Sequence, residues 1–380
     1  MPNKPIKIVH VVPSIDYGGI AAFVLNYYRY MDRERFQIDA LGISSPLAPK
    51  KTELEALGGK YYHVGVFSNT RLITNIVRWT RFFREGQYDV VHSDCNLVGA
   101  WILLAARLAG VRTRIAHSHS TGLRHSGRWQ GWYMQFRQWI LRHCATLQLA
   151  CSEEAGEAMY GKNGHWKVIP NGIDVQAFLQ GDANGTAALR KEWHIEADQR
   201  VYTLVARISG VKNHDYAVDV FHAIHRLDPR AVLVIGGSGS EYDPTERNNK
   251  TGEQMLAKIQ KYGLTDSVRV VGPQMDMRPI YGLTDCWLFV SLYEGFSISL
   301  LELQASKVPA VVSDRVTRLS DMGLGLTRFL SLNAPLEEWA EAAIQMQGRN
   351  VSDETIRNAF RQRDLDIAYN AKKLETVYES

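Results

Sequence analysis

Two glutamates, Glu294 and Glu302, lie where an apolar run ends and a helical pattern begins. The run at residues 287–290 predicts a strand, and the pattern at residues 300–305 predicts a helix. Carboxylates accept hydrogen bonds from neighbouring hydroxyls, amides at a helix start hold phosphates, and Gly295 lets a ligand approach the backbone closely. This combination suits a ligand that carries both vicinal hydroxyls and phosphate, as a nucleotide sugar does.

Two cations, Arg207 and Lys212, follow a predicted strand at residues 201–206. They are five residues apart and can converge on one diphosphate, where they would oppose the charge of a departing nucleoside diphosphate. Taken alone, each motif has a plain structural interpretation, because charged pairs in solvated loops and at helix starts are common. The two motifs lie about 80 positions apart and indicate the same ligand, and this agreement favours the functional interpretation.

A glycine pair, Gly18 and Gly19, lies between a predicted strand at residues 8–12 and a helical pattern. The amides of such a loop can face a phosphate or an acceptor. A simple tight turn explains the pair equally well, so the residues alone leave both interpretations open.

Short β-branched runs alternate with helical patterns along both halves of the chain. The alternation predicts parallel sheets covered on both faces, in two Rossmann-like β/α/β units that bind ligands at the carboxyl ends of their strands. The 380 residues exceed what one core organises, since cores stop growing near about 250–300 residues. A turn cluster at residues 170–172 predicts a domain boundary near residue 175. The predicted strands are residues 8–12, 38–41, 90–92, 114–117, 147–150, 168–169, 201–206, 232–235, 268–271, 287–290 and 310–312.

The segment at residues 291–314 resembles the donor site of the family-four retaining glycosyltransferases. Residues 150–156 and 168–174 resemble further landmarks of that family, so the resemblance spans most of the chain. It is closest to transferases that build bacterial exopolysaccharide or capsule repeat units.

The resemblance implies the GT-B fold, in which two Rossmann-like domains face an interdomain cleft. Residues 1–175 are expected to form the acceptor-binding domain and residues 176–355 the nucleotide-sugar donor domain. The C-terminal helix, at residues 356–380, is expected to cross back and pack on the first domain.

The resemblance also implies roles for the charged residues. Glu302 would accept hydrogen bonds from the ribose and Glu294 from the transferred sugar, while Arg207 and Lys212 hold the diphosphate. The implied catalytic residues are His117, Glu294, Arg207 and Lys212, and the implied donor-binding residues are Gly18, Gly19, Arg207, Lys212, Gly272, Glu294, Gly295, Phe296, Ile298, Ser299 and Glu302.

A histidine beside the donor sugar is a further implication of the resemblance. His117 is the preferred match and His119 the reserve, although a histidine at a strand end is often a structural residue. The acidic residue that often follows the family's glycine loop is missing here, because Ala21 and Ala22 follow Ile20. This departure leaves the acceptor contacts open.

The implied reaction moves a hexose from a nucleotide sugar, with UDP preferred over GDP, to a lipid-linked sugar or another glycan acceptor. No metal or other cofactor is expected, because Arg207 and Lys212 take the role that manganese has in the other main glycosyltransferase fold. Asp364 and Asp366 form a D-x-D sequence, but it lies in the terminal helical segment, and we interpret it as incidental.

Two alternatives from other classes remain open. A GT-B sugar-nucleotide epimerase would need no acceptor, and a non-catalytic relative would bind a nucleotide sugar without releasing nucleotide. A nicotinamide dehydrogenase is disfavoured, because the glycine-rich residues 236–239 lack the G-x-G-x-x-G pattern and lie in the second half.

Charge is unevenly distributed between the two halves. Residues 1–175 contain 21 Lys and Arg against 13 Asp and Glu, and the remainder contains 23 against 27. A basic half suits an anionic partner, either nucleic acid or an acidic membrane surface, and a merely solvated basic face explains it equally well. We expect a peripheral contact with an acidic membrane surface and no nucleic acid. The basic, aromatic segment at residues 124–143 is compatible with an interfacial membrane helix and with an aromatic stripe buried against the sheet.

Four cysteines without a C-x-x-C pair indicate a reduced protein. The longest apolar stretch, residues 97–110, contains Arg107 and is shorter than the about 20 residues that span a bilayer. We therefore expect a cytoplasmic protein with a peripheral position on the inner face of the plasma membrane.

Overall fold

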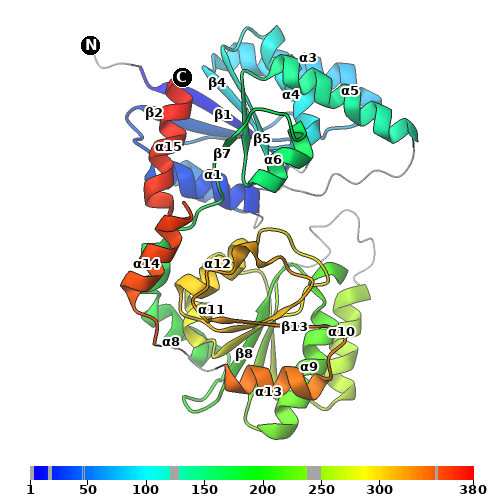
Figure 1. Cartoon of the computed structure of the whole chain (residues 1–380), viewed down its shortest axis with the longest axis vertical. Coiled ribbons are helices and arrows are strands. Elements are labelled where there is room, and N and C mark those ends of the chain that lie inside the picture. The colour runs from blue at the N-terminus through cyan, green and yellow to red at the C-terminus, as the bar shows by residue number, and fades with distance from the viewer. Residues whose placement is uncertain are drawn as a thin grey trace. The chain divides into compact units, whose positions relative to one another are not determined.

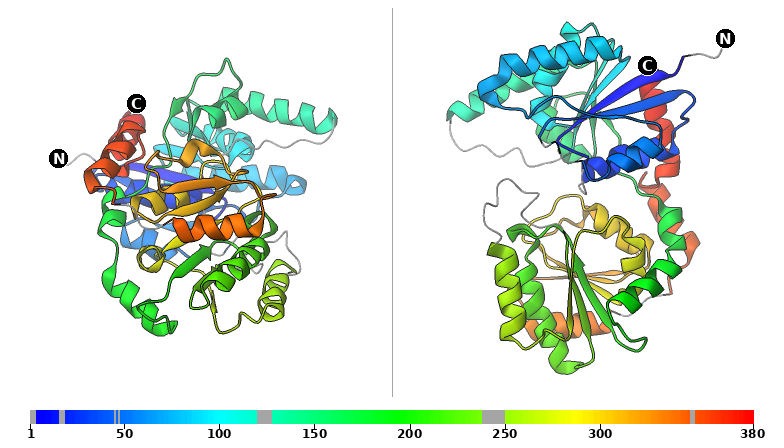
Figure 2. Two further views of the ribbon diagram at one scale, coloured as in Figure 1. Left: turned by 60° about the horizontal axis from the view of Figure 1, so that its bottom comes forward. Right: turned by 180° about the vertical axis from the view of Figure 1, so that it is seen from behind.

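The computed structural model describes residues 4–15, 19–44, 46, 48–119, 128–237, 250–346 and 350–380, and the side chains among these except 128–130 and 250. The chain divides into two compact units, Met1–Asp174 with Asp364–Ser380, and Val175–Arg363. Each unit contains a parallel sheet with helices on its faces (Figures 1 and 2). The predicted α/β class with two Rossmann-like domains is confirmed.

The sheet of the first unit has seven strands in the order β3-β2-β1-β4-β5-β6-β7. Its strands are β1 (Ile6–Val12), β2 (Phe36–Gly42), β3 (Tyr61–His63), β4 (Val90–Ser93), β5 (Thr113–Ser118), β6 (Leu147–Ala150) and β7 (Lys167–Val168). Its helices are α1 (Gly19–Tyr30), α2 (Lys51–Ala56), α3 (Leu72–Gly86), α4 (Gly99–Leu108), α5 (Arg128–Cys144), α6 (Glu153–Tyr160) and α15 (Ile367–Glu379).

The centre of this sheet carries polar residues within apolar strands. Strand β1 pairs in parallel with β4, and their register sets His10 beside His92. The neighbouring β1 residues Val9 and Val11 are fully buried, as expected for a parallel strand covered on both faces. The fold therefore places two histidines side by side in the interior.

The C-terminal helix α15 belongs to the first unit and packs beside α1 (Figures 1 and 2). Its buried residues include Ile367, Leu374 and Tyr378. The segment at residues 356–380, expected as one C-terminal helix, consists of most of α14 (Asp353–Gln362) and of α15. Between them Asp364 adopts a positive φ of 56°, a conformation that ends a helix, and α14 lies in the second unit.

The sheet of the second unit has six strands in the order β10-β9-β8-β11-β12-β13. Its strands are β8 (Val201–Val205), β9 (Val232–Gly236), β10 (Val268–Val271), β11 (Cys286–Phe289), β12 (Ala310–Ser313) and β13 (Thr327–Leu330). Its helices are α7 (Val175–Gln180), α8 (Ala183–Glu192), α9 (His214–Leu227), α10 (Lys250–Lys261), α11 (Arg278–Leu283), α12 (Ile298–Ala305), α13 (Leu336–Gln345) and α14.

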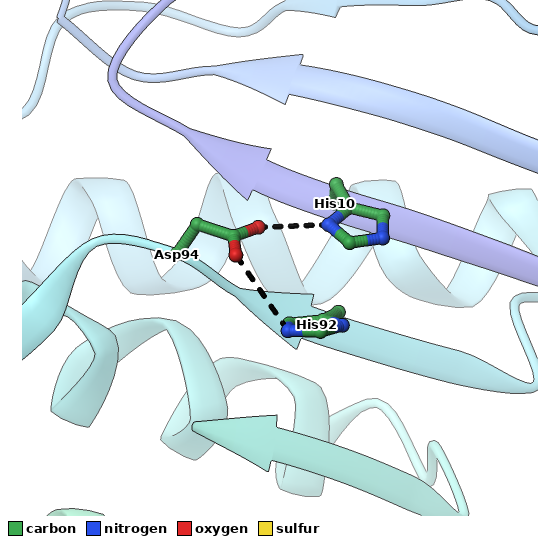
Figure 3. Close-up of side chains that lie close together, drawn as sticks. All are labelled: His10, His92 and Asp94. Carbon is green, nitrogen blue, oxygen red and sulfur yellow. Dashed lines mark hydrogen bonds and ion pairs between the residues drawn. The ribbon is translucent and has the colours of Figure 1, made fainter. Parts of the chain in front are cut away.

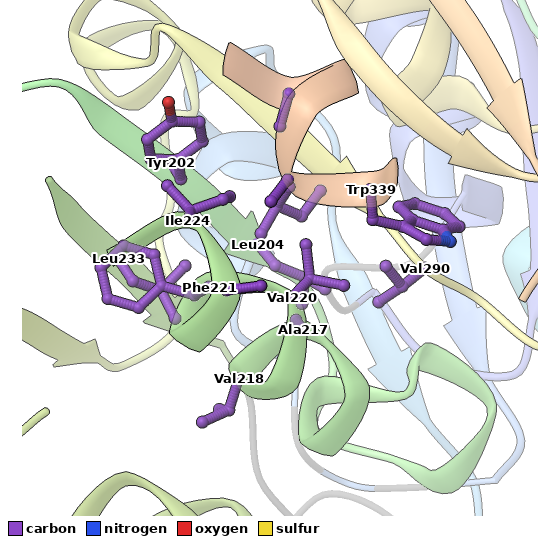
Figure 4. Close-up of a cluster of buried hydrophobic side chains, with 14 of the residues drawn as sticks. Tyr202, Leu204, Ala217, Val218, Val220, Phe221, Ile224, Leu233, Val290 and Trp339 are labelled. Atoms are coloured by element: carbon purple, nitrogen blue, oxygen red, sulfur yellow. The ribbon is translucent and has the colours of Figure 1, made fainter. Parts of the chain in front are cut away.

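Large side chains fill the core on one face of this sheet. Tyr202 and Leu204 of β8 pack with Phe221 of α9 and Trp339 of α13 (Figure 4). Phe221 and Trp339 are fully buried, and burying a side chain of this size stabilises the fold by about 1.5–3 kcal/mol. This core supports the strands whose carboxyl ends carry Arg207 and Glu294.

Candidate active site

The loop that carries Glu294 connects β11 to α12. Ser297 caps the helix, since its Oγ accepts a hydrogen bond from the amide of Leu300 at 3.3 Å. The amide of Ser297 in turn donates to Ser320 Oγ at 2.6 Å. The amides of Ile298 and Ser299 belong to the first helical turn, where backbone donors have no acceptor within the helix. The expected strand, loop and helix around Glu294 are therefore present.

Lys212 and Glu294 form a close ion pair in the second unit. The Nζ of Lys212 lies 2.9 Å from Oε1 and 2.8 Å from Oε2 of Glu294. Ser291 Oγ donates a further hydrogen bond to Glu294 Oε2 at 3.2 Å. The fold thus brings together a cation and a carboxylate from the two donor motifs.

Backbone contacts fix the two loops against each other. The amide of Leu292 donates to the carbonyl of Val211 at 2.8 Å, and Asn213 Nδ2 donates to the carbonyl of Val290 at 3.2 Å. Asn213 adopts a positive φ of 59°, which asparagine tolerates better than most residues. Lys212 is therefore held beside the Glu294 loop by the backbone as well as by its own charge.

The other predicted donor residues lie at several places in the same unit. Arg207 follows β8 and is exposed, and Gly272 follows β10 and is exposed. Phe296 and Ile298 are half-buried beside Glu294 in the loop and at the start of α12. Residues 204–206, Lys212, 287–291 and Ser299 line a small depression at the ends of β8 and β11.

Glu302 lies on α12 and is oriented by a buried tyrosine. Its Oε2 accepts a hydrogen bond from the hydroxyl of Tyr281 at 2.7 Å. Burial, together with the charge of Glu302, raises the pKa of Tyr281 well above its usual value, so the phenol remains a donor. Glu302 is half-buried and lies beside a fixed hydrogen-bond donor.

The glycines of this unit differ in whether the fold has room for a side chain at their positions. At Gly236 and Gly237, φ is 148° and 131°, and a Cβ would approach the carbonyl oxygens of Val271 and Ala206 to 2.0 and 1.9 Å. A Cβ on Gly272 or Gly295 would meet no atom within 4 Å. The fold therefore requires Gly236 and Gly237, whereas the open space at Gly295 leaves room for a ligand near the backbone.

The first unit contains a buried cluster that the sequence did not predict. His10, His92, Asp94, His117 and Tyr378 come from β1, β4 and its following loop, β5 and α15. Asp94 Oδ2 bonds His10 Nδ1 at 2.8 Å, and Figure 3 shows Asp94 facing both His10 and His92. A second oxygen, Asp94 Oδ1, lies 2.8 Å from Nε2 of His119. The sequence feature that could have indicated this cluster is the presence of histidines inside otherwise apolar strands.

His117, the preferred candidate, lies inside this cluster and is fully buried. Its Nδ1 lies 3.0 Å from Nε2 of His92, and its Nε2 is buried with no hydrogen-bond partner among the residues that the structure describes. His119 also has a buried nitrogen, Nδ1, that has no partner within the described part of the chain. Buried polar atoms without partners are rare in proteins, and these two nitrogens are still able to form a hydrogen bond.

Burial controls ionisation in the cluster. It lowers the pKa of His92 and of His117 well below the usual value. Burial acts to raise the pKa of Asp94, but hydrogen bonds from His10 and His119 help to hold it well below its usual value. The cluster thus combines an ionised carboxylate with at least two neutral imidazoles at neutral pH.

Two overlapping sets in the cluster have atoms close enough for a metal ion, within 4.8 Å of one another. They are His10, His92 and Asp94, and Asp94, His117 and His119. Several of these atoms are already engaged in hydrogen bonds within the cluster. The side chains can therefore satisfy one another without an ion.

The glycine loop is described only in part. Gly18 lies outside the described residues, and Gly19 is exposed at the first position of α1.

Helix α5 exposes an aromatic surface. Trp132, Phe136 and Trp139 are 65%, 40% and 56% exposed, and their rings stack in succession along the helix. Arg137 Nε and Arg142 NH2 donate instead to the backbone carbonyls of Leu97 and Tyr160. Of the two interpretations, the buried aromatic stripe is wrong for these three side chains. Among the described helices, none has the length and apolar character that spanning a bilayer requires.

The chain matches two sequence families in tandem. Residues 17–177 match the family described as Glycosyltransferase Family 4, and residues 186–346 match Glycosyl transferases group 1. The glycosyltransferase named EpsF of Bacillus subtilis is 30% identical over 100% of this chain and 97% of its own length. The UDP-Gal:alpha-D-GlcNAc-diphosphoundecaprenol alpha-1,3-galactosyltransferase of Escherichia coli is 24% identical over 82% of this chain and 80% of its own length.

Solved structures share the fold. HepE of Anabaena, in complex with UDP-glucose, superposes with a TM-score of 0.76 at 17% identity and covers 98% of this chain and 100% of its own. This likeness supports the GT-B arrangement of two α/β domains. The two family matches and the full-length similarity to EpsF show that the chain belongs to the family-four glycosyltransferases and is a glycosyltransferase of GT-B fold.

Proposed function

We propose that the protein is a retaining glycosyltransferase that moves a hexose from a UDP-sugar to a lipid-linked sugar or another glycan in cell-surface polysaccharide synthesis. The observation that carries the proposal is the Lys212–Glu294 pair beside the start of α12. The names of two relatives support the donor and acceptor classes, since one names UDP-Gal and a diphosphoundecaprenol acceptor and the other was solved with UDP-glucose.

The ion pair suggests how the donor would bind. A diphosphate carries more negative charge than one carboxylate and would compete with Glu294 for Nζ of Lys212. Glu294, still held by Ser291, would then have oxygens available to accept hydrogen bonds from sugar hydroxyls. Arg207 would add a second cation to the diphosphate, and the amides of Ile298 and Ser299 would supply donors at the helix start.

The two cations would also serve the chemical step. As the bond between the sugar C1 and the phosphate oxygen breaks, negative charge grows on the departing UDP. Lys212 and Arg207 would stabilise that charge in place of a metal ion. We therefore propose that the reaction proceeds without a metal cofactor.

Retention requires that the new bond form on the face that the phosphate leaves. Asp94, a buried carboxylate of the first unit, is bound by His10 and His119 and is unsuited to act as a covalent nucleophile. We propose instead same-face attack, in which the acceptor oxygen bonds to C1 as the C1–phosphate bond breaks. The acceptor proton passes to the departing phosphate, so atoms and charge balance.

The exposed aromatic surface of α5 suits a lipid acceptor. Trp132, Phe136 and Trp139 expose apolar area with polar edges, as interfacial aromatic side chains do. On the adjoining helices, Val77 of α3 and Leu108 of α4 are also exposed. We propose that this surface rests on the membrane in which a lipid-linked acceptor lies.

A donor panel with product analysis tests the proposal. Purified protein in EDTA is offered UDP-glucose, UDP-galactose, UDP-N-acetylglucosamine and GDP-mannose, with and without membrane lipid extract. Release of UDP that increases with extract, with a glycosylated lipid detected by mass spectrometry, is the expected result. An altered sugar nucleotide formed without acceptor would indicate an epimerase, and binding without nucleotide release would indicate a non-catalytic protein.

A further inference from the structure

The loop between β12 and β13, residues 314–326, contacts both ends of the segment that carries Glu294 to α12. At one end, the amide of Thr317 donates to the carbonyl of Glu294 at 3.2 Å. At the other, Ser320 Oγ accepts a hydrogen bond from the amide of Ser297 at 2.6 Å. The β12–β13 loop therefore borders the backbone of residues 294–297 from its first residue to its last.

Gln304 of α12 connects this loop to the helix through a buried side chain. Its Nε2 donates to the carbonyls of Ser320 at 2.7 Å and of Leu300 at 2.8 Å. Its Oε1 accepts a hydrogen bond from the amide of Met322 at 2.8 Å. Both hydrogens of the side-chain nitrogen are thus used, and the oxygen has a donor of its own.

These partners determine the orientation of the Gln304 amide. Carbonyl groups only accept hydrogen bonds and backbone amides only donate them, so the nitrogen faces Ser320 and the oxygen faces Met322. Gln304 and Ser320 are both fully buried, where water does not replace a lost partner and an unpaired polar group is costly. The three bonds therefore hold the β12–β13 loop in one position against α12.

Ser320 extends this restraint to the start of α12. Its carbonyl is bound by Gln304 and its hydroxyl by the amide of Ser297. Ser297 is the N-cap of α12, and the next two amides, of Ile298 and Ser299, have no acceptor within the helix. The position of Ser297 therefore determines where these two amides point.

We propose that Gln304 is a positioning residue for donor binding, which acts through Ser320 to fix the start of α12 where its amides meet the diphosphate. The proposal rests on the proposed function, which assigns the amides of Ile298 and Ser299 to the donor phosphates. It assigns to Gln304 an effect on the phosphate part of the donor affinity and none on the nucleoside part. A buried side chain without substrate contact thereby controls how tightly a nucleotide sugar binds.

Two variants interrupt the connection at different points. Gln304→Met keeps an unbranched side chain and removes all three of its hydrogen bonds. Ser320→Ala leaves the carbonyl of residue 320 bound to Gln304 and removes only the acceptor of the Ser297 amide. Arg363 still holds the loop in both variants, since its NH1 donates to the carbonyl of Asp321 at 2.6 Å.

Thr203→Val is the matched control. Thr203 of β8 is fully buried in the same unit, and its Oγ1 lies 2.9 Å from Oγ1 of Thr284. Valine has nearly the shape of threonine, so this variant also removes a buried hydrogen bond. It does so without changing a partner of Gln304, Ser320 or Ser297, and it shows what a loss of stability alone does to binding.

Hydrogen exchange of the unliganded, full-length protein tests the restraint itself. Mass spectrometry should show faster exchange in peptides that cover residues 294–301 in Gln304→Met and in Ser320→Ala. Thr203→Val should leave the exchange of these peptides unchanged. Wild-type exchange in Gln304→Met would show that Gln304 does not fix the start of α12 and would overturn the inference.

Binding of UDP and of uridine, measured by ligand-observed NMR titration, tests the consequence. Gln304→Met and Ser320→Ala should each weaken UDP binding roughly fivefold to tenfold, as expected for weakened hydrogen bonds, and leave uridine binding unchanged. The double variant should bind UDP no more weakly than the weaker single variant, because both act on one connection. Thr203→Val should bind both ligands as the wild type does.

Three binding results would overturn the inference. One is wild-type UDP affinity in Gln304→Met, and another is an equal loss of UDP and uridine affinity, which a general structural defect would cause. The third is a double variant in which the two losses multiply. A wild-type protein that binds no UDP would instead contradict the proposed function, and hydrogen exchange would still decide whether Gln304 fixes the start of α12.

Discussion

Lys212 and Glu294 are 82 positions apart in the chain, yet both oxygens of the carboxylate lie within 2.9 Å of the lysine Nζ. The pair is partly buried, and the loops on either side are joined by the bond from the Leu292 amide to the Val211 carbonyl. A diphosphate bound to Lys212 would displace Glu294 toward a sugar hydroxyl. Donor binding and sugar recognition are thus expected to depend on each other.

Glu294→Gln keeps the shape of the side chain and removes its charge. We expect transfer to fall about 100-fold or more, as when one positioned polar group is removed from a catalytic site. The steady-state rate of nucleotide release measures this loss of transfer activity. The matched control is Glu337→Gln, an exposed glutamate of the same unit that pairs with Arg226, and an equal loss of activity in that control would refute the assigned role.

Arg207→Ala tests the second cation. Arg207 is exposed after β8, so the fold should persist while turnover falls about 100-fold. Circular dichroism shows whether the variant is folded, and nucleotide release measures its activity. Wild-type turnover in this variant would remove Arg207 from the mechanism.

Metal independence gives a separate expectation. Because Lys212 and Arg207 are proposed to stabilise the departing UDP, extensive dialysis against EDTA should leave the rate unchanged. Metal content is measured on the same sample by mass spectrometry. A rate that vanishes with EDTA and returns with Mn²⁺ would contradict the proposed role of the cations.

Three buried histidines should make stability depend on pH. Burial lowers the pKa of His214 to about 4 and lowers those of His92 and His117 well below the usual value. Below about pH 6.5 the unfolded chain binds protons that the native state excludes, so stability falls as pH falls, by up to about 1.4 kcal/mol per pH unit for each histidine. Urea unfolding between pH 7 and 5 measures the slope.

His214→Gln is the variant for this pH dependence. It should flatten the slope by up to about 1.4 kcal/mol per pH unit in the window from about 6.5 to about 4. His222, which lies on the same helix and is stacked on Tyr262, supplies the control variant His222→Gln. Identical slopes in the wild type and His214→Gln would show that this histidine does not titrate as described.

The exposed aromatic surface of α5 predicts membrane affinity. Replacing Trp132, Phe136 and Trp139 together by serine should weaken binding to phosphatidylglycerol vesicles roughly tenfold or more, because apolar area no longer enters the interface. Vesicle co-sedimentation measures the binding. Val270→Ser, at an exposed apolar residue of the second unit, is the control, and undiminished binding of the triple variant would exclude this surface.

Local patterns predicted the strands that form the middle of both sheets. Apolar runs such as the one in β8 are buried on both faces and stand out in the sequence. Strands β3 and β13 lie at sheet edges and are only partly buried, so their residues show no such run. Hydrophobic patterns in a sequence indicate burial, and β3 and β13 are only partly buried.

The site was predictable where its residues are close in the chain. Glu294, Gly295 and the start of α12 form one local motif. Lys212 lies beside this motif because the neighbouring strands β8 and β11 end close together. The bond between Tyr378 and His10 joins residues 368 positions apart. Only the packing of α15 on the first sheet creates that contact, and neither residue has a local motif that would indicate it.

The configuration of the new glycosidic bond shows whether the protein is a retaining transferase. Wild-type protein in EDTA is incubated with the UDP-sugar selected from the donor panel and with lipid extract, and the anomeric configuration of the purified product is determined by proton NMR. We expect a product whose sugar has the same α configuration as in the UDP-sugar, and no such product from Glu294→Gln. A β-linked product, or only free sugar and UDP, would contradict it.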